Sequence, residues 1–107
     1  MRFIAMEITI RIIVCLRPLV EIVRQNDSKL AGQITTAGSS ISLNLGEGDR
    51  RTGRDRKHFF KISSGSAEEV RTALRVAVAW GYLKEESIRE VLEDIDQYQA
   101  IMWKLTR

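Results

Sequence analysis

The sequence Asn44-Leu45-Gly46-Glu47-Gly48, followed directly by Asp49-Arg50-Arg51-Thr52-Gly53-Arg54-Asp55-Arg56-Lys57, decides the fold of this chain. A helical pattern of apolar residues ends in the first part. A glycine-flanked turn with most of the clustered positive charge follows before the next apolar pattern begins. The two parts therefore mark a boundary between two helices, and the most basic segment of the chain lies at this boundary.

The segment before the boundary is predicted to be a helix over residues 28–47. Its apolar residues recur at steps of four, three, four and four, the spacing of one helix face: Leu30, Ile34, Ala37, Ile41 and Leu45. The run Asn26-Asp27-Ser28 offers three capping residues where this helix begins. Its other side is made of small residues that another helix can approach closely: Thr35, Gly38, Ser39 and Ser42.

The segment after the boundary is predicted to be a helix over residues 53–80. The hydroxyl of Thr52 can cap it, with Asp55 in the matching capping-box position, and Gly81 is suited to a left-handed cap at its end. A patch of small residues on this helix is suited to facing the small residues of the preceding one: Ser63, Ser66 and Ala67. Its polar side is mainly basic and continues from the turn: Lys57, Lys61, Ser64, Glu68, Arg71 and Arg75.

Two further helices are predicted, over residues 4–25 and 85–106. In the first, apolar and charged residues follow a period of 3.6, and Pro18 predicts a kink because it removes one backbone donor. A strand followed by a helix that starts at Pro18 is the alternative. The last helix has an apolar stripe from Ile88 onwards and a solvent-exposed side: Arg89, Glu90, Glu93, Asp94, Asp96 and Gln97.

Four helices joined by short turns predict an all-α, antiparallel up-down-up-down four-helix bundle, as one domain over residues 1–107. The first and third helices are apolar over a wider face than the core of a single bundle normally requires. A closed ring of identical subunits would bury the remainder. We therefore expect a homo-oligomer.

Composition and charge indicate the class of protein and the compartment in which we expect it. The 107 residues are 44% hydrophobic and 29% charged, which is typical of a small globular domain with a thin core. The net charge is only +3, but residues 49–61 alone carry six basic and two acidic residues, or +4. Cys15 is the only cysteine, so no intrachain disulfide is possible, and charges interrupt the apolar N-terminal segment too often for a membrane span. We expect a cytoplasmic protein without membrane association.

The residues offer little material for catalysis. His58 is the only histidine, no spacing of Cys, His or carboxylates around it matches a metal site, and no known phosphate-loop or nucleophile motif is present. Asn44 and Glu47 form the one unusual polar pair. It is either a general acid or base with an orienting amide, or a structural pair that bonds the serines of the third helix or the backbone of the turn. We adopt the structural interpretation and expect no enzyme activity, catalytic residue, metal or cofactor.

The arginine-rich turn has two interpretations. It is a phosphate-contacting surface, or it is a solvated turn whose charges pair with acidic residues of another subunit or of the last helix. The aromatic residues Trp80, Tyr82, Tyr98 and Trp103 do not interleave with the basic residues, so stacking on single-stranded bases is not expected. The candidate nucleic-acid-binding residues are Arg50, Arg51, Arg54, Arg56, Lys57, Lys61, Arg71 and Arg75.

The second helix and the boundary resemble a signature of the small four-helix-bundle proteins encoded in intervening sequences of bacterial 23S rRNA genes. The similarity covers residues 29–105, although Thr35 and Thr36 stand where that family often has two arginines. The matching residues of the second helix are Gln33, Ile34, Ala37, Ser40, Ile41 and residues 44–48. The basic turn and the third helix match at Phe59, Gly65, Ser66, Ala67, Glu69, Leu74, Ala77, Gly81, Tyr82 and Leu83.

The resemblance implies a ring-shaped homopentamer and carries over no catalytic residue. Accessory variability proteins of diversity-generating retroelements are a related group, similarly pentameric and basic, that binds RNA and a reverse transcriptase. We therefore expect a non-enzymatic homo-oligomer that binds RNA or DNA through the basic turn and the stripe of the third helix. The alternative is a protein-interaction scaffold, or an accessory subunit of a partner such as a reverse transcriptase, without direct contact to nucleic acid.

Overall fold

The computed structural model describes residues 2–107 and contains four α-helices joined by short turns. These are α1 (Arg2–Asn26), α2 (Ser28–Asp49), α3 (Gly53–Ala79) and α4 (Glu85–Thr106), and their ends lie within two residues of the predicted ends. The described part of the chain contains no strand, so the all-α prediction is confirmed. Helix α1 continues through Pro18, and the alternative of a strand before this proline is wrong.

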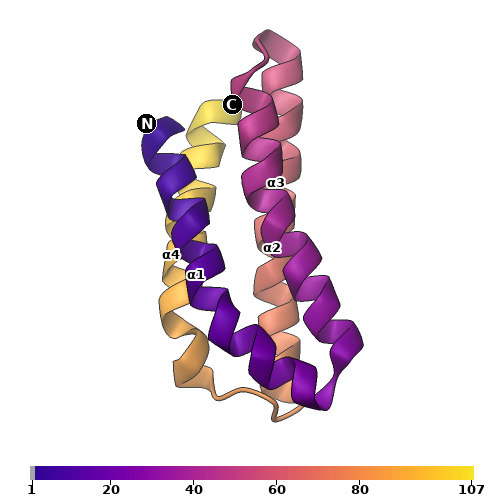
Figure 1. Ribbon diagram of the computed structural model, residues 1–107. Helices are drawn as coiled ribbons and strands as arrows, with labels where there is room; N and C mark the ends of the chain where they lie inside the picture. Colours follow the sequence, from indigo (N-terminus) through magenta and orange to yellow (C-terminus); the bar gives the residue numbers. More distant parts are fainter. Residues whose placement is uncertain (1) are drawn as a thin grey trace.

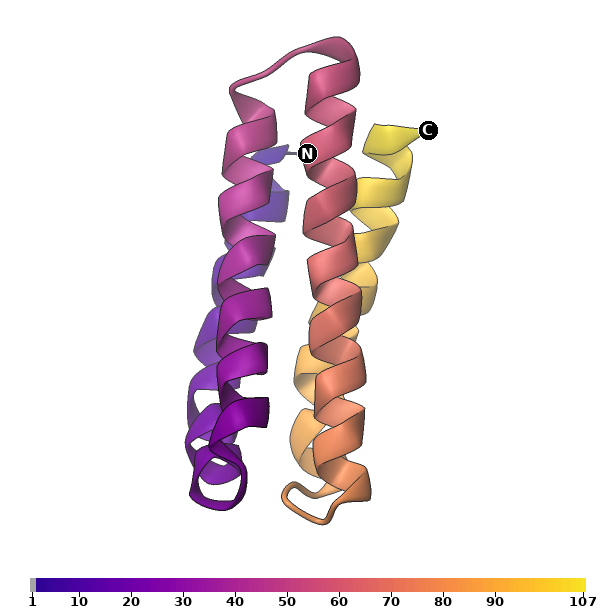
Figure 2. The same ribbon diagram turned by 90° about the vertical axis from the view of Figure 1, so that its right-hand side faces the viewer.

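Consecutive helices run in opposite directions (Figures 1 and 2). Helix α1 packs against α2, α2 against α3, α3 against α4, and α4 against α1, so the helices follow one another around a square. The bundle is elongated, with extents of 42 × 22 × 19 Å. The turn between α2 and α3 lies at the same end as the start of α1 and the end of α4 (Figure 1). We call this the α2–α3 end. It comprises residues 44–61, the first turns of α1 and the last turns of α4.

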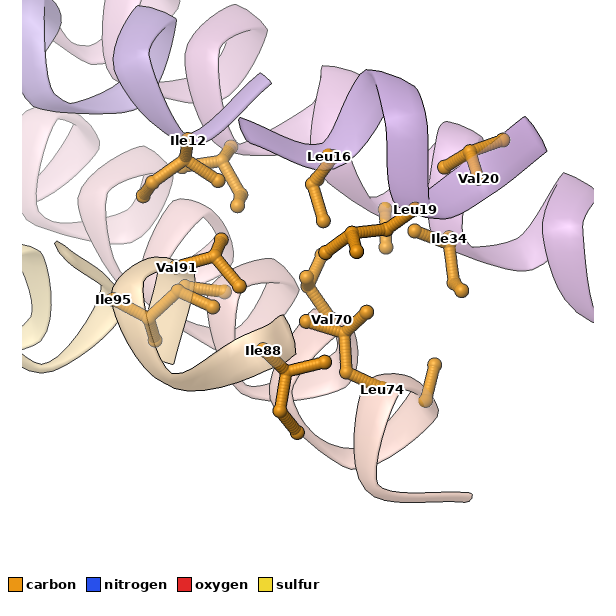
Figure 3. Packing of buried hydrophobic residues seen from close by; sticks show 14 of the residues in the cluster. Ile12, Leu16, Leu19, Val20, Ile34, Val70, Leu74, Ile88, Val91 and Ile95 are labelled. Atoms are coloured by element: carbon orange, nitrogen blue, oxygen red, sulfur yellow. The ribbon is translucent and has the colours of Figure 1, made fainter. Parts of the chain in front are cut away.

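A single hydrophobic cluster joins all four helices (Figure 3). The predicted apolar face of α2 belongs entirely to this cluster, since each of its five residues is buried. Burial of one large aliphatic side chain stabilises a fold by about 1.5–3 kcal/mol, so the cluster is the main source of stability. The side chains labelled in Figure 3 come from every helix: Ile12, Leu16, Leu19, Val20, Ile34, Val70, Leu74, Ile88, Val91 and Ile95.

A buried chain of hydrogen bonds crosses this core and joins three helices. The hydroxyl of Ser63 in α3 donates to the carbonyl of Ile41 in α2 at 2.6 Å, and the same oxygen bonds the hydroxyl of Tyr98 in α4. Ser63 has one hydroxyl proton, which it gives to the carbonyl, so Tyr98 is the donor to Ser63. Burial disfavours the charged phenolate and raises the pKa of Tyr98 to about 12.

The small residues of α2 are divided between two neighbouring helices. Gly38 faces α1, since an added Cβ there would lie 3.1 Å from Cδ1 of Leu16. The small patch of α3 instead meets Ile41 through Ser63, and Ser40, whose hydroxyl oxygen lies 2.7 Å from that of Ser66. The small patch of α3 therefore meets a small residue of α2, as predicted, but at Ser40 and not at Gly38, because α1 and α3 pack on different sides of α2.

The predicted caps are present at some helix ends and not at others. The carboxylate of Asp27 caps α2 by accepting the N–H of Leu30 at 3.0 Å, and Gly81 ends α3 with a φ of 84°, so both predicted caps are confirmed. The side chain of Thr52 makes no cap hydrogen bond to the described residues, so that prediction is wrong. The backbone carbonyl of Thr52 accepts the N–H of Arg56 instead, at 3.4 Å.

Candidate nucleic-acid interface

The polar residues of the 44–48 stretch are engaged within the bundle. The amide of Asn44 donates to the carbonyl of Ser40 at 3.0 Å and to its hydroxyl at 2.9 Å, and this hydroxyl reaches Ser66 of α3. The carboxylate of Glu47 pairs with Arg51 at 2.9 Å. Asn44 therefore reaches a serine of α3 through Ser40, while Glu47 pairs with an arginine and not with the backbone of the turn. Asn44 thus approaches a serine of α3 as the structural interpretation expects, whereas Glu47 makes a different contact from those expected.

Gly48 allows the start of α3 to approach the end of α2. A Cβ added at Gly48 would lie 2.6 Å from two ring carbons of Phe60, whose side chain is fully buried. At Gly46, by contrast, the nearest atom would be Cε of Met6 at an ordinary 3.8 Å. The close approach at Gly48 fixes where the basic turn between the two helices lies.

Arg51 and Arg71, two of the predicted binding residues, are held by other groups of the protein. The guanidinium of Arg51 pairs with Glu47 and Asp55, and its central carbon lies 4.8 Å from the ring centre of Phe59. These contacts offset the charge of Arg51 within the turn. The charge is therefore paired, but with residues of α2 and α3 and not with the last helix as the second interpretation supposed.

Arg71 is removed from the basic stripe by contacts with α4. Its side chain is only 19% exposed and pairs with Glu68 and with Asp96. It also donates to the side-chain oxygen of Gln99 at 2.9 Å. The predicted stripe along α3 is therefore interrupted at this position.

The other predicted residues keep more of their charge available. Arg50, Arg54, Lys61 and Arg75 are exposed and form no ion pair within residues 2–107. Arg50 and Arg54 lie on either side of the turn, and Lys61 lies about two helical turns further along α3. Arg75 is 21 residues beyond Arg54, or roughly 30 Å along a helix that rises 1.5 Å per residue. The structure thus groups the first three and separates Arg75 from them.

A hollow at the α2–α3 end gathers cations from α1 and α3. It has a volume of about 300 Å³, with Arg2, Arg56 and Lys57 around Phe60 and Leu105, and we call it the basic hollow. Arg2 forms a long ion pair of 3.5 Å with Asp49, and Lys57 contacts the backbone carbonyl of Arg107 at 3.3 Å. Arg2 was missed from the sequence because it lies far along the chain from the turn. Antiparallel topology was the one available signal, since it places the start of α1 beside the α2–α3 turn.

The end of α4 adds an aromatic residue to this basic region. Trp103 is 62% exposed, and the guanidinium carbon of Arg107 lies 4.8 Å from its ring centre. Trp103 and Lys61 line the same groove between α3 and α4, with a volume of about 370 Å³, which we call the α3–α4 groove. The prediction that the aromatic residues do not interleave with the basic ones is wrong for Trp103. Antiparallel packing places the end of α4 beside the start of α3.

A second polar cluster lies between α1 and α4. Asp94, predicted on the solvent-exposed side of α4, is buried and accepts two hydrogen bonds from Arg11, at 3.0 and 3.2 Å, because α4 turns this residue toward α1. Beside it, Sγ of Cys15 lies 3.8 Å from a carboxylate oxygen of Glu90. Burial raises the pKa of the Cys15 thiol and the Glu90 carboxylate adds to this, so the thiol stays protonated at neutral pH. Such a thiol is not an activated nucleophile.

Two further properties of the described residues concern metal binding and the crossing of a membrane. No group of three or more Cys, His, Asp or Glu side chains among them could hold a metal ion. None of the helices in residues 2–107 has both the length and the apolar character needed to cross a membrane.

Comparison with known proteins gives one family and one fold. Residues 4–104 match the model of the 23S rRNA-intervening sequence protein family. A similar solved structure is the crystal structure of a protein of unknown function from the S23 ribosomal protein family of Bacteroides thetaiotaomicron VPI-5482. It has a TM-score of 0.87 and 18% sequence identity, and the match covers 98% of this chain and 96% of that chain. At this identity the likeness shows the fold alone. No curated protein matches the sequence.

Proposed function

This chain belongs to the 23S rRNA-intervening sequence protein family, and we propose that it is a non-enzymatic homo-oligomer that binds RNA or DNA at the α2–α3 end. One observation carries the proposal: basic residues of α1, of α3 and of the turn between α2 and α3 gather at this end, and several of them form no ion pair within residues 2–107. Cations that neutralise phosphates release condensed counterions, which is the main source of sequence-independent affinity for nucleic acids.

The basic residues are expected to divide into two groups. Arg50, Arg54 and Lys61 contact phosphates directly, because exposed cations without an ion-pair partner have no internal contact to break on binding. The basic residues around the basic hollow share one phosphate group in this proposal, which is supported by their common position in its lining. Arg51 and Arg71 stay with their carboxylates and contribute to the stability of the bundle.

A charge-matched pair of variants tests the proposal. The test variant changes three cations of the α2–α3 end to glutamine: Arg50, Arg54 and Lys61. The control makes the same change at three exposed cations elsewhere: Lys29, Lys84 and Arg89. In a plot of the logarithm of the binding constant against the logarithm of the salt concentration, each neutralised phosphate contributes about 0.7–0.9 to the downward slope. The slope of the test variant should therefore be shallower than that of the wild type by roughly 2–3. The control should bind like the wild type.

Two results would overturn the proposal. One is the absence of binding by the wild type to RNA and to DNA at low salt. The other is an equal loss of affinity in the test and control variants, which would mean that only net charge matters. Fluorescence anisotropy with labelled oligonucleotides over a range of salt concentrations measures the affinities that decide both results.

The proposal includes assembly into a closed ring, with the five subunits that the family resemblance implies. Large exposed apolar side chains on α1 and α2 support it, since Phe3 is 77%, Val14 is 54% and Leu43 is 71% exposed. Contact between subunits would bury such side chains. A monomer measured by light scattering at micromolar concentration would contradict this part. We also place the protein in the cytoplasm, in keeping with its single, unpaired cysteine.

A groove between α1 and α2 supports a second candidate, a protein-interaction scaffold or accessory subunit, for example of a reverse transcriptase. The groove has a volume of about 710 Å³, and its walls include Ile13, Val14 and Pro18 of α1 and Gly38 of α2. Such a surface suits the apolar face of a partner. Co-purification of a partner after nuclease treatment, insensitive to salt, would favour this candidate over nucleic-acid binding.

A further inference from the structure

We infer that Trp103 is a stacking position for a base of single-stranded nucleic acid, and that the α2–α3 end therefore prefers single strands to duplexes. The inference rests on the proposed binding of RNA or DNA and specifies its substrate class. It comes from the neighbours that Trp103 acquires in the bundle, which lie far from it in the sequence.

The α3–α4 groove has room beside the tryptophan ring. Its volume of about 370 Å³ falls within the range of ligand pockets, about 300–1,000 Å³. Gly65 lies in its wall, and a Cβ added there would meet no atom within 4 Å, so this part of the groove is open. Trp103 itself is 62% exposed, which leaves ring surface free for an aromatic partner.

Two basic residues lie near Trp103, one over its ring and one in the lining of the groove. Lys61 lines the same groove, and Arg107 places its guanidinium over the ring of Trp103. The backbone carbonyl of Arg107 contacts the ammonium group of Lys57, which connects the groove to the basic hollow. A strand whose phosphates follow these cations would bring a base to the ring, the combination of charge and stacking that single-strand-binding proteins use.

The acidic residue of the groove is bound within the protein. Glu68 lines the groove, and its carboxylate pairs with Arg71 at 3.2 Å and accepts a hydrogen bond from Gln99 at 3.1 Å. Arg71 also pairs with Asp96, so it offsets the charge of Glu68 only in part. Lys61 forms no ion pair within residues 2–107, so its charge is available to attract a phosphate.

A duplex cannot use Trp103 in this way. Its bases are paired and stacked on one another, so an exposed tryptophan at the protein surface meets only the backbone. Duplex binding would depend on the cations alone, whereas single-strand binding would add the stacking contribution. The difference between the two substrates is therefore the measurable signature of Trp103.

The chain contains a matched control for this residue. Trp80, the other tryptophan, is 69% exposed, similar to Trp103. It ends α3 at the opposite end of the bundle and stacks on Tyr82, with ring centres 6.5 Å apart. Changing either tryptophan to leucine removes an exposed indole without changing the net charge.

The experiment measures binding of a single-stranded oligonucleotide and of a duplex of equal length by the wild type, Trp103→Leu and Trp80→Leu. Trp103→Leu should weaken single-strand binding by about five- to hundredfold, leave duplex binding within about twofold, and keep the salt slope. Trp80→Leu should bind both as the wild type does. Because Trp103 is the only tryptophan left in Trp80→Leu, its fluorescence should be quenched by the single strand and not by the duplex.

The possible failures are distinguishable. Equal single-strand affinity of Trp103→Leu and the wild type, or an equal loss for both substrates, overturns this inference and leaves the proposed function standing. A change in subunit number of Trp103→Leu by light scattering would assign Trp103 to a subunit interface and overturn it as well. Failure of the wild type to bind any nucleic acid would overturn the proposed function and this inference together.

Discussion

The change Gly48→Ala is expected to destabilise the bundle, whereas Gly46→Ala, two residues earlier in the same helix, is expected to stabilise it. Neither glycine has a positive φ, so alanine can adopt the backbone conformation at both positions. Alanine in a helix gains about 0.5–1 kcal/mol over glycine, because it loses less conformational entropy on folding. The two variants therefore share this gain and differ only in what the new methyl group meets.

The atoms around each glycine decide whether the change to alanine destabilises or stabilises the bundle. At Gly48 the new Cβ would lie 2.6 Å from Cδ1 and Cε1 of Phe60 and 3.3 Å from the carbonyl oxygen of Arg56. Carbon atoms pack best at about 3.5–4.0 Å, and the fully buried ring of Phe60 cannot move away without opening the core. Overpacking of this kind costs about 1–3 kcal/mol, so we expect a net loss of roughly 1–2 kcal/mol. At Gly46 the contact of 3.8 Å with Met6 is ordinary, and the gain remains.

Urea unfolding followed by circular dichroism measures both effects. All variants must be compared at one protein concentration, because assembly would make the apparent stability depend on it. Phe60→Leu in the Gly48→Ala background identifies the cause, since a smaller side chain should recover part of the loss in a double-mutant cycle. A Gly48→Ala protein as stable as Gly46→Ala would refute the reasoning, and so would a cycle without coupling between Gly48 and Phe60.

Two further predictions concern buried polar groups. Raising the pH from about 10 to about 12 should lower the free energy of unfolding by roughly 2 kcal/mol through Tyr98, whose pKa is raised to about 12 by burial. Since the folded state has the higher pKa, this contribution is complete below about pH 10, and Tyr98→Phe should flatten this part of the pH profile of urea unfolding. Arg11→Ala should lower the unfolding midpoint more than Asp94→Ala, because it leaves a buried carboxylate without its partner. The reverse order of the two midpoints would contradict this expectation.

The helices could be predicted because their signals lie within a few residues. Asp27 caps the amide of a residue three positions on, and Gly81 supplies a positive φ that other residues rarely adopt. Thr52 shows the limit of such signals. Its hydroxyl has the right position in the sequence and its backbone has the extended conformation of a cap, yet the side chain makes no cap hydrogen bond to the described residues.

The candidate site could be predicted only in part. The charge of residues 50–57 is visible in the sequence, but which charges are paired is not. Arg71 is held by residues of α4 that lie 25 and 28 positions away. Arg2 and Trp103 reach the α2–α3 end from the first and the last helix. No short stretch of sequence around the turn therefore contains them.

The number of helices, their ends and the apolar face of each follow from local sequence, because each depends on residues within one or two turns. The contacts between helices do not. The burial of Asp94, the bond between Ser63 and Tyr98, and the position of Trp103 beside Lys61 depend on how far each helix is rotated and shifted along its neighbours. Packing of the whole core sets these rotations and shifts, since no single segment buries its apolar face alone.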